Sequence, residues 1–366
     1  MAAPETAQTS LLRPLVEDLL ARREQIKLGG GEEKIAKQHA AEKLTARERL
    51  ALLIDDGTFT ELGIHGRPHF AQRAMDGKVA PADGVITGYG KVDGRLVAVC
   101  AYDFTVMAGS MGMTGELKVT RLRELALTKR IPFIWLLDSA GARIQEAVGS
   151  LFAGSGHLFR EEVVMSGVIP QIAALMGPCA AGTAYIPGLA DFVPMVKGRG
   201  SMALAGPHLV RAAVGEDVSQ EELGGSRVHT RKSGVGDLEV ADDEECILRI
   251  KQYLSFMPQN CEAKPPTLAS ADPIERGDEE LLDVLPESNR KPYDMYEVIR
   301  RIADDGFYFD MKPQWAKTII TCFARFGGRP VGIVANQPKH LGGILDNDSS
   351  DKAARFVNLC NAFAIP

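Results

Sequence analysis

Residues 131–146 read Ile-Pro-Phe-Ile-Trp-Leu-Leu-Asp-Ser-Ala-Gly-Ala-Arg-Ile-Gln-Glu. Residues 133–137 are continuously apolar, which is typical of a strand buried on both faces in an α/β protein. Residues 139–142 then have almost no side-chain bulk, and we expect them to open a helix. Because the first N–H groups of a helix are unpaired and carry partial positive charge, this turn is a candidate site for an anion or for an oxygen that becomes one.

A second turn of the same kind lies further along the chain. Residues 176–185 read Met-Gly-Pro-Cys-Ala-Ala-Gly-Thr-Ala-Tyr and follow the apolar run 169–175. Two strand–turn–helix units can aim two sets of N–H donors into one cleft. Glycine and alanine after a strand also serve close packing of a helix on that strand, so the residues alone leave both interpretations open. The sequence also leaves open what the next polar residues, Arg143, Gln145 and Glu146, do. They could orient the first turn, bind a ligand or simply form a polar helix start.

Length and composition indicate two domains without an obvious nucleic-acid or membrane partner. The chain has 366 residues, of which 45% are hydrophobic and 25% are charged, and its formal net charge is −6. This length exceeds that of one typical domain, and the negative charge does not favour nucleic acid or a membrane surface. No apolar run is long enough to span a membrane, and the first residues resemble neither a signal peptide nor a transit peptide. The six cysteines form no CxxC pair, so we expect a cytoplasmic protein without a zinc or redox site.

Local signals predict the order of helices and strands. Thr45 and Glu48 form a capping box, which predicts a helix start, and Asp93-Gly94 between two apolar runs predicts a hairpin turn. Amphipathic patterns predict helices over residues 11–28, 32–44, 115–130, 151–164 and 246–254, and apolar runs predict strands over 84–92, 96–101, 133–137, 169–175 and 191–196. The predicted division is an N-terminal helix (1–28), a first domain (29–265), a Pro- and Ala-rich linker (266–278) and a second domain (279–366).

The end of the chain repeats an earlier part of it. When Pro132 is aligned with Pro366, Ile86-Thr87 meets Ile320-Thr321 and Lys118 meets Lys352, with no gap. Agreement in one ungapped register predicts two structurally related units. Because the second copy stops where the first reaches its buried strand and turn, we expect a fragment, or a short version, of a two-domain protein.

Several familiar catalytic motifs do not occur. The chain has no GxxxxGK[ST] sequence, and neither turn spells GxGxxG or GxSxG. Ser139 paired with His157 or His208 would suggest a hydrolase, but no sequence feature ties these residues together. The remaining histidines lack metal-ligand spacing, so no metal site is predicted.

Short sequences throughout the chain match one known family. They include Lys-Leu-Thr-Ala-Arg-Glu-Arg at 43–49, Asp-Ser-Ala-Gly-Ala-Arg-Ile-Gln-Glu at 138–146, Gly-Pro-Cys at 177–179 and Glu-Glu-Leu-Gly-Gly at 221–225. With these residues the chain resembles the carboxyltransferase (β) subunit of biotin-dependent acyl-CoA carboxylases, a ligase/transferase group that includes propionyl-CoA and methylcrotonyl-CoA carboxylases.

The resemblance implies a fold and a reaction. The expected fold is α/β and crotonase-like (ClpP/crotonase), a βαβ superhelix with two related domains, of which the second is truncated here. The first domain would bind the acyl-CoA, and the second domain of a partner subunit would bind carboxybiotin. The carboxyl group would move to the α carbon, or the vinylogous γ carbon, through an enolate. In such a reaction the protein mainly supplies fixed N–H donors for the enolate oxygen.

The resemblance also implies site residues. Ala181 and Gly182 match the family's acyl-CoA oxyanion site, and Gly141 and Ala142 belong to the first turn. The neighbours in the two turns, expected to bind substrate, are Ser139, Ala140, Arg143, Thr183 and Tyr185. Ala181-Gly182 stands where propionyl-type members often have Gly-Gly and methylcrotonyl-type members have Ala-Gly, which leaves the acyl group open.

Partners follow from the resemblance in the same way. Biotin would be carried by a biotin carboxylase/biotin carboxyl carrier subunit, and the chain would form a homo-oligomer, expected to be a hexamer. A chain that stops at Pro366 would lack the family's biotin turn, so we expect it not to carboxylate alone. Two other readings are a biotin-dependent acyl-CoA decarboxylase subunit and a truncated, non-catalytic chain for acyl-CoA binding or assembly.

Overall fold

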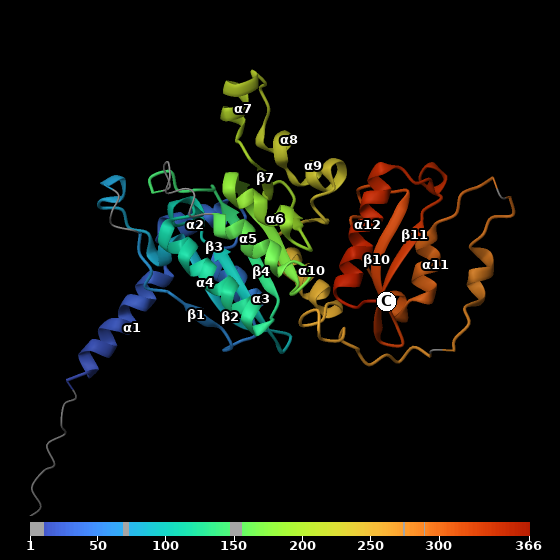
Figure 1. Cartoon of the computed structure of the whole chain (residues 1–366), viewed down its shortest axis with the longest axis horizontal. Helices are drawn as coiled ribbons and strands as arrows, with labels where there is room; N and C mark the ends of the chain where they lie inside the picture. The colour runs from blue at the N-terminus through green and yellow to red at the C-terminus, as the bar shows by residue number, and fades with distance from the viewer. Residues whose placement is uncertain (1–10, 69–72, 147–155, 274, 289) are drawn as a thin grey trace, which may run out of the picture.

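The computed structural model describes residues 11–68, 73–146, 156–273, 275–288 and 290–366. A larger unit is built on an eight-stranded sheet and a smaller unit on a three-stranded sheet (Figure 1). The strand order is β1-β2-β3-β4-β5-β6-β8 in the larger sheet, where β7 pairs with β5, and β11-β10-β9 in the smaller one. The strands are β1 (Thr60–Leu62), β2 (Val85–Val92), β3 (Arg95–Tyr102), β4 (Phe133–Ser139), β5 (Gln171–Ala180), β6 (Pro194–Val196), β7 (Ser201–Ala203), β8 (Leu238–Val240), β9 (Tyr308–Met311), β10 (Ile319–Phe326) and β11 (Arg329–Asn336).

The helices cover both faces of the larger sheet. Strand β4 is buried throughout, and its side chains alternate between two cores: Trp135 packs with residues of α4 and α5, whereas Ile134 packs with residues of α3 and α10. The two-sided burial expected from the apolar run 133–137 is therefore confirmed. The α-helices are α1 (Arg13–Lys27), α2 (Glu32–Ala40), α3 (Ala46–Leu53), α4 (Met113–Lys129), α5 (Gly156–Met165), α6 (Tyr185–Leu189), α7 (Pro207–Val214), α8 (Gln220–Gly224), α9 (Ser226–Val228), α10 (Asp243–Phe256), α11 (Met295–Ile302) and α12 (Asn347–Ala362).

Local sequence signals set several element boundaries. Thr45 and Glu48 form the expected capping box at the start of α3, with each side chain accepting the other residue's N–H. Asp93 and Gly94 both have positive φ, of 48° and 78°, and join β2 to β3 in a tight antiparallel hairpin. No helix among the described residues is long and apolar enough to cross a membrane.

The expectation of a helix directly after the first turn is wrong for the residues described there. Ala142 instead forms a parallel bridge with Met111, and residues 144–146 form a turn. The bridge holds the chain in extended form, because Met111 N–H donates to Gly141 O at 2.9 Å and Arg143 N–H donates to Met111 O at 3.0 Å. The start of the helix predicted over 151–164 lies outside the described residues.

The internal repeat is confirmed by matching hydrogen bonds. Lys118 Nζ donates to the carbonyls of Ala82 and Val85 at 2.8 and 2.6 Å, and Lys352 Nζ donates to the equivalent carbonyls of Ala316 and Ile319 at 3.5 and 2.8 Å. The hairpin β10–β11 followed by α12 thus repeats β2–β3 followed by α4. The register extends to the last residue: Ala98 N–H donates to Pro132 O at 2.9 Å, and Gly332 N–H donates to Pro366 O at 2.7 Å.

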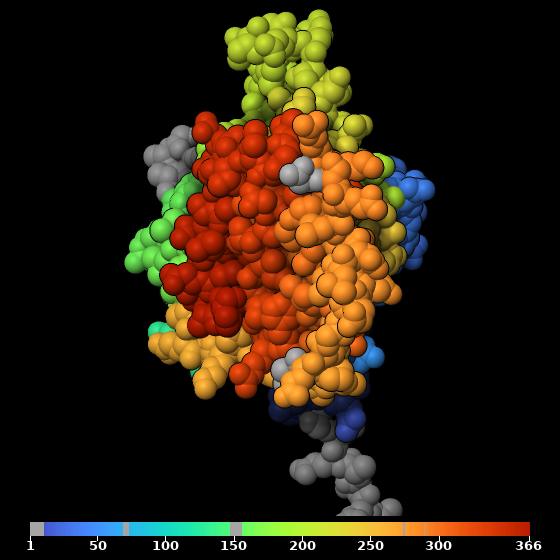
Figure 2. Space-filling view, turned by 90° about the vertical axis from the view of Figure 1, so that its right-hand side faces the viewer, coloured from blue at the N-terminus to red at the C-terminus, as the bar shows by residue number. Residues whose placement is uncertain are grey.

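Aromatic side chains join the two units. Phe192 of the larger unit stacks on Tyr253 of α10, with ring centroids 4.5 Å apart. Tyr253 meets Phe323 of β10 edge-on, and the ring centroids of Phe323 and Phe356 of α12 are 4.9 Å apart. Figure 2 looks onto the smaller unit and shows the chain after α10 lying beside β10 and α12 in one continuous face, with the α7 arm projecting above it.

Candidate active site

The two small-residue turns lie against each other at the ends of neighbouring strands. Strands β4 and β5 are parallel, and Ser139 at the end of β4 is paired with Cys179 of β5. Gly141 has a φ of +92°, and a Cβ added there would lie 2.5 Å from Ala180 O. Only glycine allows the first turn to approach the second this closely, so the expectation that one cleft receives both turns is supported by their contact.

We expect Gly141→Ala to lower the free energy of unfolding clearly more than Gly31→Ala does. Both glycines have a φ of +92°, but a Cβ at Gly31 would meet nothing within 4 Å. Both variants therefore carry the conformational cost of about 1–3 kcal/mol, and Gly141→Ala adds a clash with backbone. Urea unfolding of the two variants measures the difference; equal losses would show that the two turns do not touch as described.

Most N–H groups of the first turn already have acceptors. Ala140 donates to Ala108 O at 2.9 Å, Gly141 donates to Ser139 Oγ at 3.1 Å, and Arg143 donates to Met111 O. Ala142 N–H alone in this turn has no acceptor among the described residues. The first turn thus offers one donor, rather than the several that a helix start would offer.

The second turn offers a donor of its own. Ala181 has a φ of +51°, and residues Ala181–Ala184 form a short 3₁₀ helix. Thr183 Oγ1 donates to Ala180 O at 2.8 Å, and Cys179 Sγ contacts Thr183 O at 3.0 Å, so both side chains hold the turn in shape. Gly182 N–H has no acceptor within the described part of the chain, and the nearest atom to a Cβ added there would be Met111 Sδ at 3.7 Å.

Ala142 and Gly182 both line a cavity of about 720 Å³. One wall is a face of α4, from Met113 past Leu117, and the other comes from α5, α6 and the second turn. In this second wall the rings of Tyr185 and Phe159 meet edge-on, with their centroids 4.8 Å apart. The lining is largely apolar, and it includes one or more residues of each turn. Lining residues that sequence reasoning missed, because they carry no motif, are Met111, Met113, Leu117, Thr120, Arg121, Phe159 and Leu204.

The remaining residues of the two turns have other places. Ser139 and Thr183 are fully buried, with their hydroxyl groups bonded to the turns themselves. Ala140 lines a separate cavity of about 250 Å³ together with Phe104 and Leu223. Among the described residues, Ser139 Oγ has no hydrogen bond to His157 or His208, so the structure gives the hydrolase hypothesis no support.

Arg143 is buried and organises the cavity wall from behind. Its guanidinium is paired with Asp83 and with Glu146, and it donates to Ser110 O at 2.9 Å. The two carboxylates in turn accept the N–H groups of Gly115 and Met113 at the start of α4, each at 2.7 Å. Burial raises the pKa of Asp83 even though Arg143 lies beside it. Arg143 therefore positions α4 against the first turn, a role that sequence proximity could not reveal because Asp83 lies 60 residues away.

A second buried network holds the end of β4. The carboxylate of Asp138 is fully buried and accepts from Lys43, Gln38 and Arg49 at 2.8–3.0 Å. Arg49 also pairs with Asp243 of α10 at 2.8 Å. Burial lowers the pKa of Lys43, which the charge of Asp138 partly opposes. The network joins α2, α3 and α10 at the residue that directly precedes the first turn.

Next to the cavity, α4 and α5 bring three glutamates close to Arg123. They are Glu116, Glu161 and Glu162. Arg123 pairs with Glu161 at 2.5 Å, and Tyr102 donates to Glu116 at 3.0 Å. Glu162 is 1% exposed, and its carboxylate has no hydrogen-bond partner among the residues described. Burial raises the pKa of Glu162 to about 8, so this carboxyl group is protonated at neutral pH.

We expect the free energy of unfolding of Glu162→Gln to exceed that of the unmodified protein by an amount that grows as the pH rises. A carboxyl group with a raised pKa in the folded state contributes stability below about pH 4.5, which is lost as the pH rises to about 8. Glutamine does not titrate, so the two free energies of unfolding should differ by no more than about 1 kcal/mol near pH 5 and by at most about 5 kcal/mol at pH 8. Urea unfolding from pH 5 to 8 measures this. Glu124→Gln, at an exposed position on α4, is the control, and a pH-independent difference would contradict the prediction.

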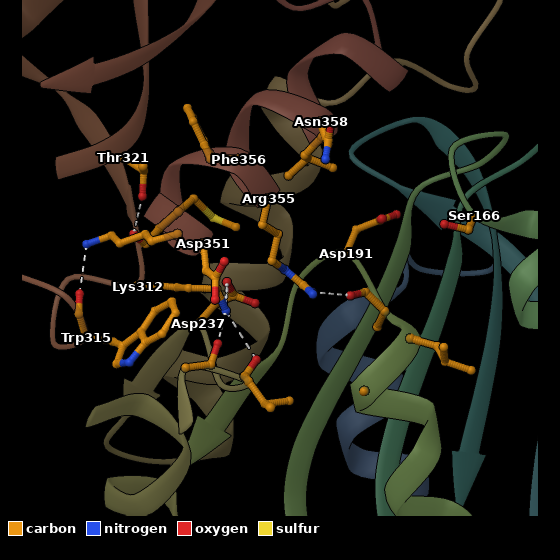
Figure 3. Close-up of a pocket in the computed structure, with 18 of the residues that line it drawn as sticks. Ser166, Asp191, Asp237, Lys312, Trp315, Thr321, Asp351, Arg355, Phe356 and Asn358 are labelled. Atoms are coloured by element: carbon orange, nitrogen blue, oxygen red, sulfur yellow. Dashed lines mark hydrogen bonds and ion pairs between the residues drawn. The ribbon is translucent and has the colours of Figure 1, made fainter. Parts of the chain in front are cut away.

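A further cavity, of about 570 Å³, lies between the larger unit and α12 (Figure 3). Arg355 reaches across it and donates to Ala190 O at 2.7 Å, and Lys312 pairs with Asp237 at 2.9 Å. Burial raises the pKa of Asp191 at its edge to about 7. These polar contacts join the units, and the cavity contains none of the turn residues, so it is distinct from the candidate active site.

Comparison with known proteins agrees with this geometry. The family model described as "Carboxyl transferase domain" matches residues 37–366. The chain is 45% identical over 352 residues to the methylmalonyl-CoA decarboxylase subunit alpha of Veillonella parvula, covering 96% of this chain and 68% of the relative. It is 43% identical over 355 residues to the propionyl-CoA carboxylase beta chain of Roseobacter denitrificans, covering 97% and 69%.

The solved structures give the same result. A crystal structure of transcarboxylase 12S, described as a hexamer assembly with hydrolysed methylmalonyl-coenzyme A bound, superimposes with a TM-score of 0.94 and 42% identity, covering 99% of this chain and 70% of that one. The geometry of the two turns, the family model and these relatives agree: this chain belongs to the carboxyl transferase domain family, as a carboxyltransferase subunit of the biotin-dependent acyl-CoA carboxylases.

Proposed function

We propose that the cavity beside α4 binds the thioester end of an acyl-CoA, and that Ala142 and Gly182 donate their N–H groups to its carbonyl oxygen. The observation that carries this proposal is that Ala142 and Gly182, whose N–H groups have no acceptor among the described residues, come from two touching turns and line the same cavity. Loss of the α-proton places negative charge on the thioester oxygen, and fixed N–H donors stabilise that charge without reorganising. Ala181 contributes through its backbone, since its positive φ directs the chain so that Gly182 follows at the cavity edge.

The other turn residues have supporting roles in this proposal. Gly141 allows the turns to touch, Ser139 and Thr183 hold their shapes, and Arg143 positions the start of α4. Tyr185 lines the pocket, while Ala140 lies on the opposite side of the first turn. Carboxybiotin, carried by a partner subunit, would supply the carboxyl group and take up the proton.

Wider features of the family extend the proposal. The fold is crotonase-like, with a first domain over 29–265, a linker over 266–278 and part of a second domain over 279–366; the repeated hairpin and helix support two related domains. The chain assembles with copies of itself, as the transcarboxylase 12S hexamer does, and works in the cytoplasm with a biotin carboxylase/biotin carboxyl carrier subunit. The substrate class is a short acyl-CoA of the propionyl or methylmalonyl type, which the relatives act on.

Decarboxylation is a second candidate function. The chain is as similar to two methylmalonyl-CoA decarboxylase alpha subunits, at 45% and 43% identity, as to propionyl-CoA carboxylase beta chains. Both reactions pass through the same enolate, so the two N–H donors serve either direction. Because one enzyme catalyses both directions of this transfer, the partner distinguishes the two: co-purification with a biotin carboxylase subunit supports the carboxylase, and co-purification with a membrane pump subunit supports the decarboxylase.

Titration calorimetry with acetyl-, propionyl-, methylmalonyl- and methylcrotonyl-CoA tests the proposal. We expect one of the short thioesters to bind more tightly than free CoA. As a further check, Leu117→Arg on the cavity wall should weaken thioester binding, whereas Leu96→Arg on the exposed side of β3 should not. If folded protein binds no thioester better than free CoA, the assignment of this cavity is wrong.

A further inference from the structure

Within the described part of the chain, helix α1 is held only at its base. None of its residues is buried, and Figure 1 shows it projecting from the larger unit. Just beyond its end, Gly30 N–H donates to Thr105 Oγ1 at 3.0 Å, and a Cβ added at Gly29 would lie 2.5 Å from Asp103 Oδ2. These contacts fix the point where α1 leaves the larger unit. The outer turns of the helix are not buried against any other described element.

One side of α1 is an apolar stripe. It consists of residues at the spacing i, i+3, i+4, i+7 and i+8, which places all five side chains on one face. The opposite face carries Ala21, Gln25 and an ion pair between Asp18 and Arg22 at 2.5 Å. An isolated helix of this length is only marginally stable in water, so a stripe of this kind requires an apolar surface to cover it. The stripe residues, with their exposed fractions, are Leu12 (66%), Leu15 (65%), Val16 (51%), Leu19 (40%) and Leu20 (51%).

We propose that this stripe docks on a second copy of the chain, an inference that rests on the self-assembly proposed above and assigns a surface to it. The matched protomer of transcarboxylase 12S covers 99% of this chain, including most of α1, and comes from a hexamer. A protomer that aligns with most of α1 therefore assembles with copies of itself in that protein. The charged residues of α1 are of both signs, unlike the strongly basic face of helices that lie on membranes. They are Arg13, Glu17, Asp18, Arg22, Arg23, Glu24 and Lys27.

Two carboxylates placed in the stripe should break the contact. We expect the variant Leu15→Asp/Leu19→Asp to dissociate into smaller species in sedimentation velocity, with an assembly constant weakened at least about 100-fold, because truncating central apolar contacts costs most of an interface. The matched control is Ala21→Asp/Gln25→Asp, which adds the same charges to the opposite, exposed face of α1 and should sediment like the unmodified chain. Far-UV circular dichroism and the Tm verify that both variants fold.

Each other outcome has a distinct meaning. If Leu15→Asp/Leu19→Asp assembles like the unmodified chain, α1 is not the docking surface, although self-assembly stands. If the unmodified chain is itself monomeric, the proposed self-assembly fails. If the variant keeps its assembly but loses binding to the biotin-carrying partner, or to phosphatidylserine vesicles in flotation, the stripe serves that partner or lipid and the proposal is overturned.

Discussion

Replacing Gly182 by glycolic acid, which turns its N–H into an ester oxygen, is expected to lower kcat for carboxyl transfer about 10²–10³-fold, measured on a chain that extends through the second domain together with its biotin-carrying partner. The exchange removes one hydrogen-bond donor and leaves the shape of the turn nearly unchanged. It is a sharper test than Ala181→Pro, because Ala181 has a φ of +51° and proline fixes φ near −65°. The effect should appear in kcat and kcat/KM with little change in the Kd for free CoA, since the donor acts on the charge that develops during the reaction.

The same exchange at Gly77 is the control. Gly77 lies in an exposed loop, with nothing within 4 Å of an added Cβ, so an ester there should leave kcat unchanged. An ester at Ala142 should reproduce the loss seen at Gly182 if both N–H groups bind the same oxygen. Full activity of the Gly182 ester in well-folded protein would show that this N–H does not face the reacting carbonyl.

The second large effect concerns stability. We expect Arg49→Met to lower the free energy of unfolding by about 3–5 kcal/mol, because it leaves the buried carboxylates of Asp138 and Asp243 without their shared cation. Lys43 still pairs with Asp138, which limits the loss at that carboxylate. Urea unfolding at neutral pH measures the effect, and adding Asp243→Asn should recover part of it, since an amide needs no counter-charge.

Arg47 provides a matched control on the same helix. It pairs with Glu61 at 2.9 Å, but 25% of its side chain is exposed, so Arg47→Met should cost no more than about 1 kcal/mol. If the two variants lose equal stability, the network around Asp138 is no more important than an ordinary surface pair. The comparison also bears on function, because Asp138 directly precedes the first turn and a loosened β4 end should raise KM.

The sequence was sufficient for features that depend on neighbours in the chain. The capping box at Thr45, the hairpin at Asp93-Gly94 and the two-sided strand at 133–137 follow from turn chemistry and periodicity over a few residues. The internal repeat was also readable, because an ungapped register needs no knowledge of packing. The resemblance in short motifs was enough to identify the family, which the comparisons confirm.

Tertiary structure decided which donors remain free. From sequence, every N–H of the first turn was a candidate, but those of Ala140 and Arg143 are taken by carbonyls more than thirty residues away, Ala108 and Met111. The cavity wall likewise comes from α4, and Arg143 lies behind that wall because Asp83 is its partner. Local patterns specify helices, strands and turns, whereas the acceptor that each polar group finds depends on segments that meet only when the sheet and its helices pack together.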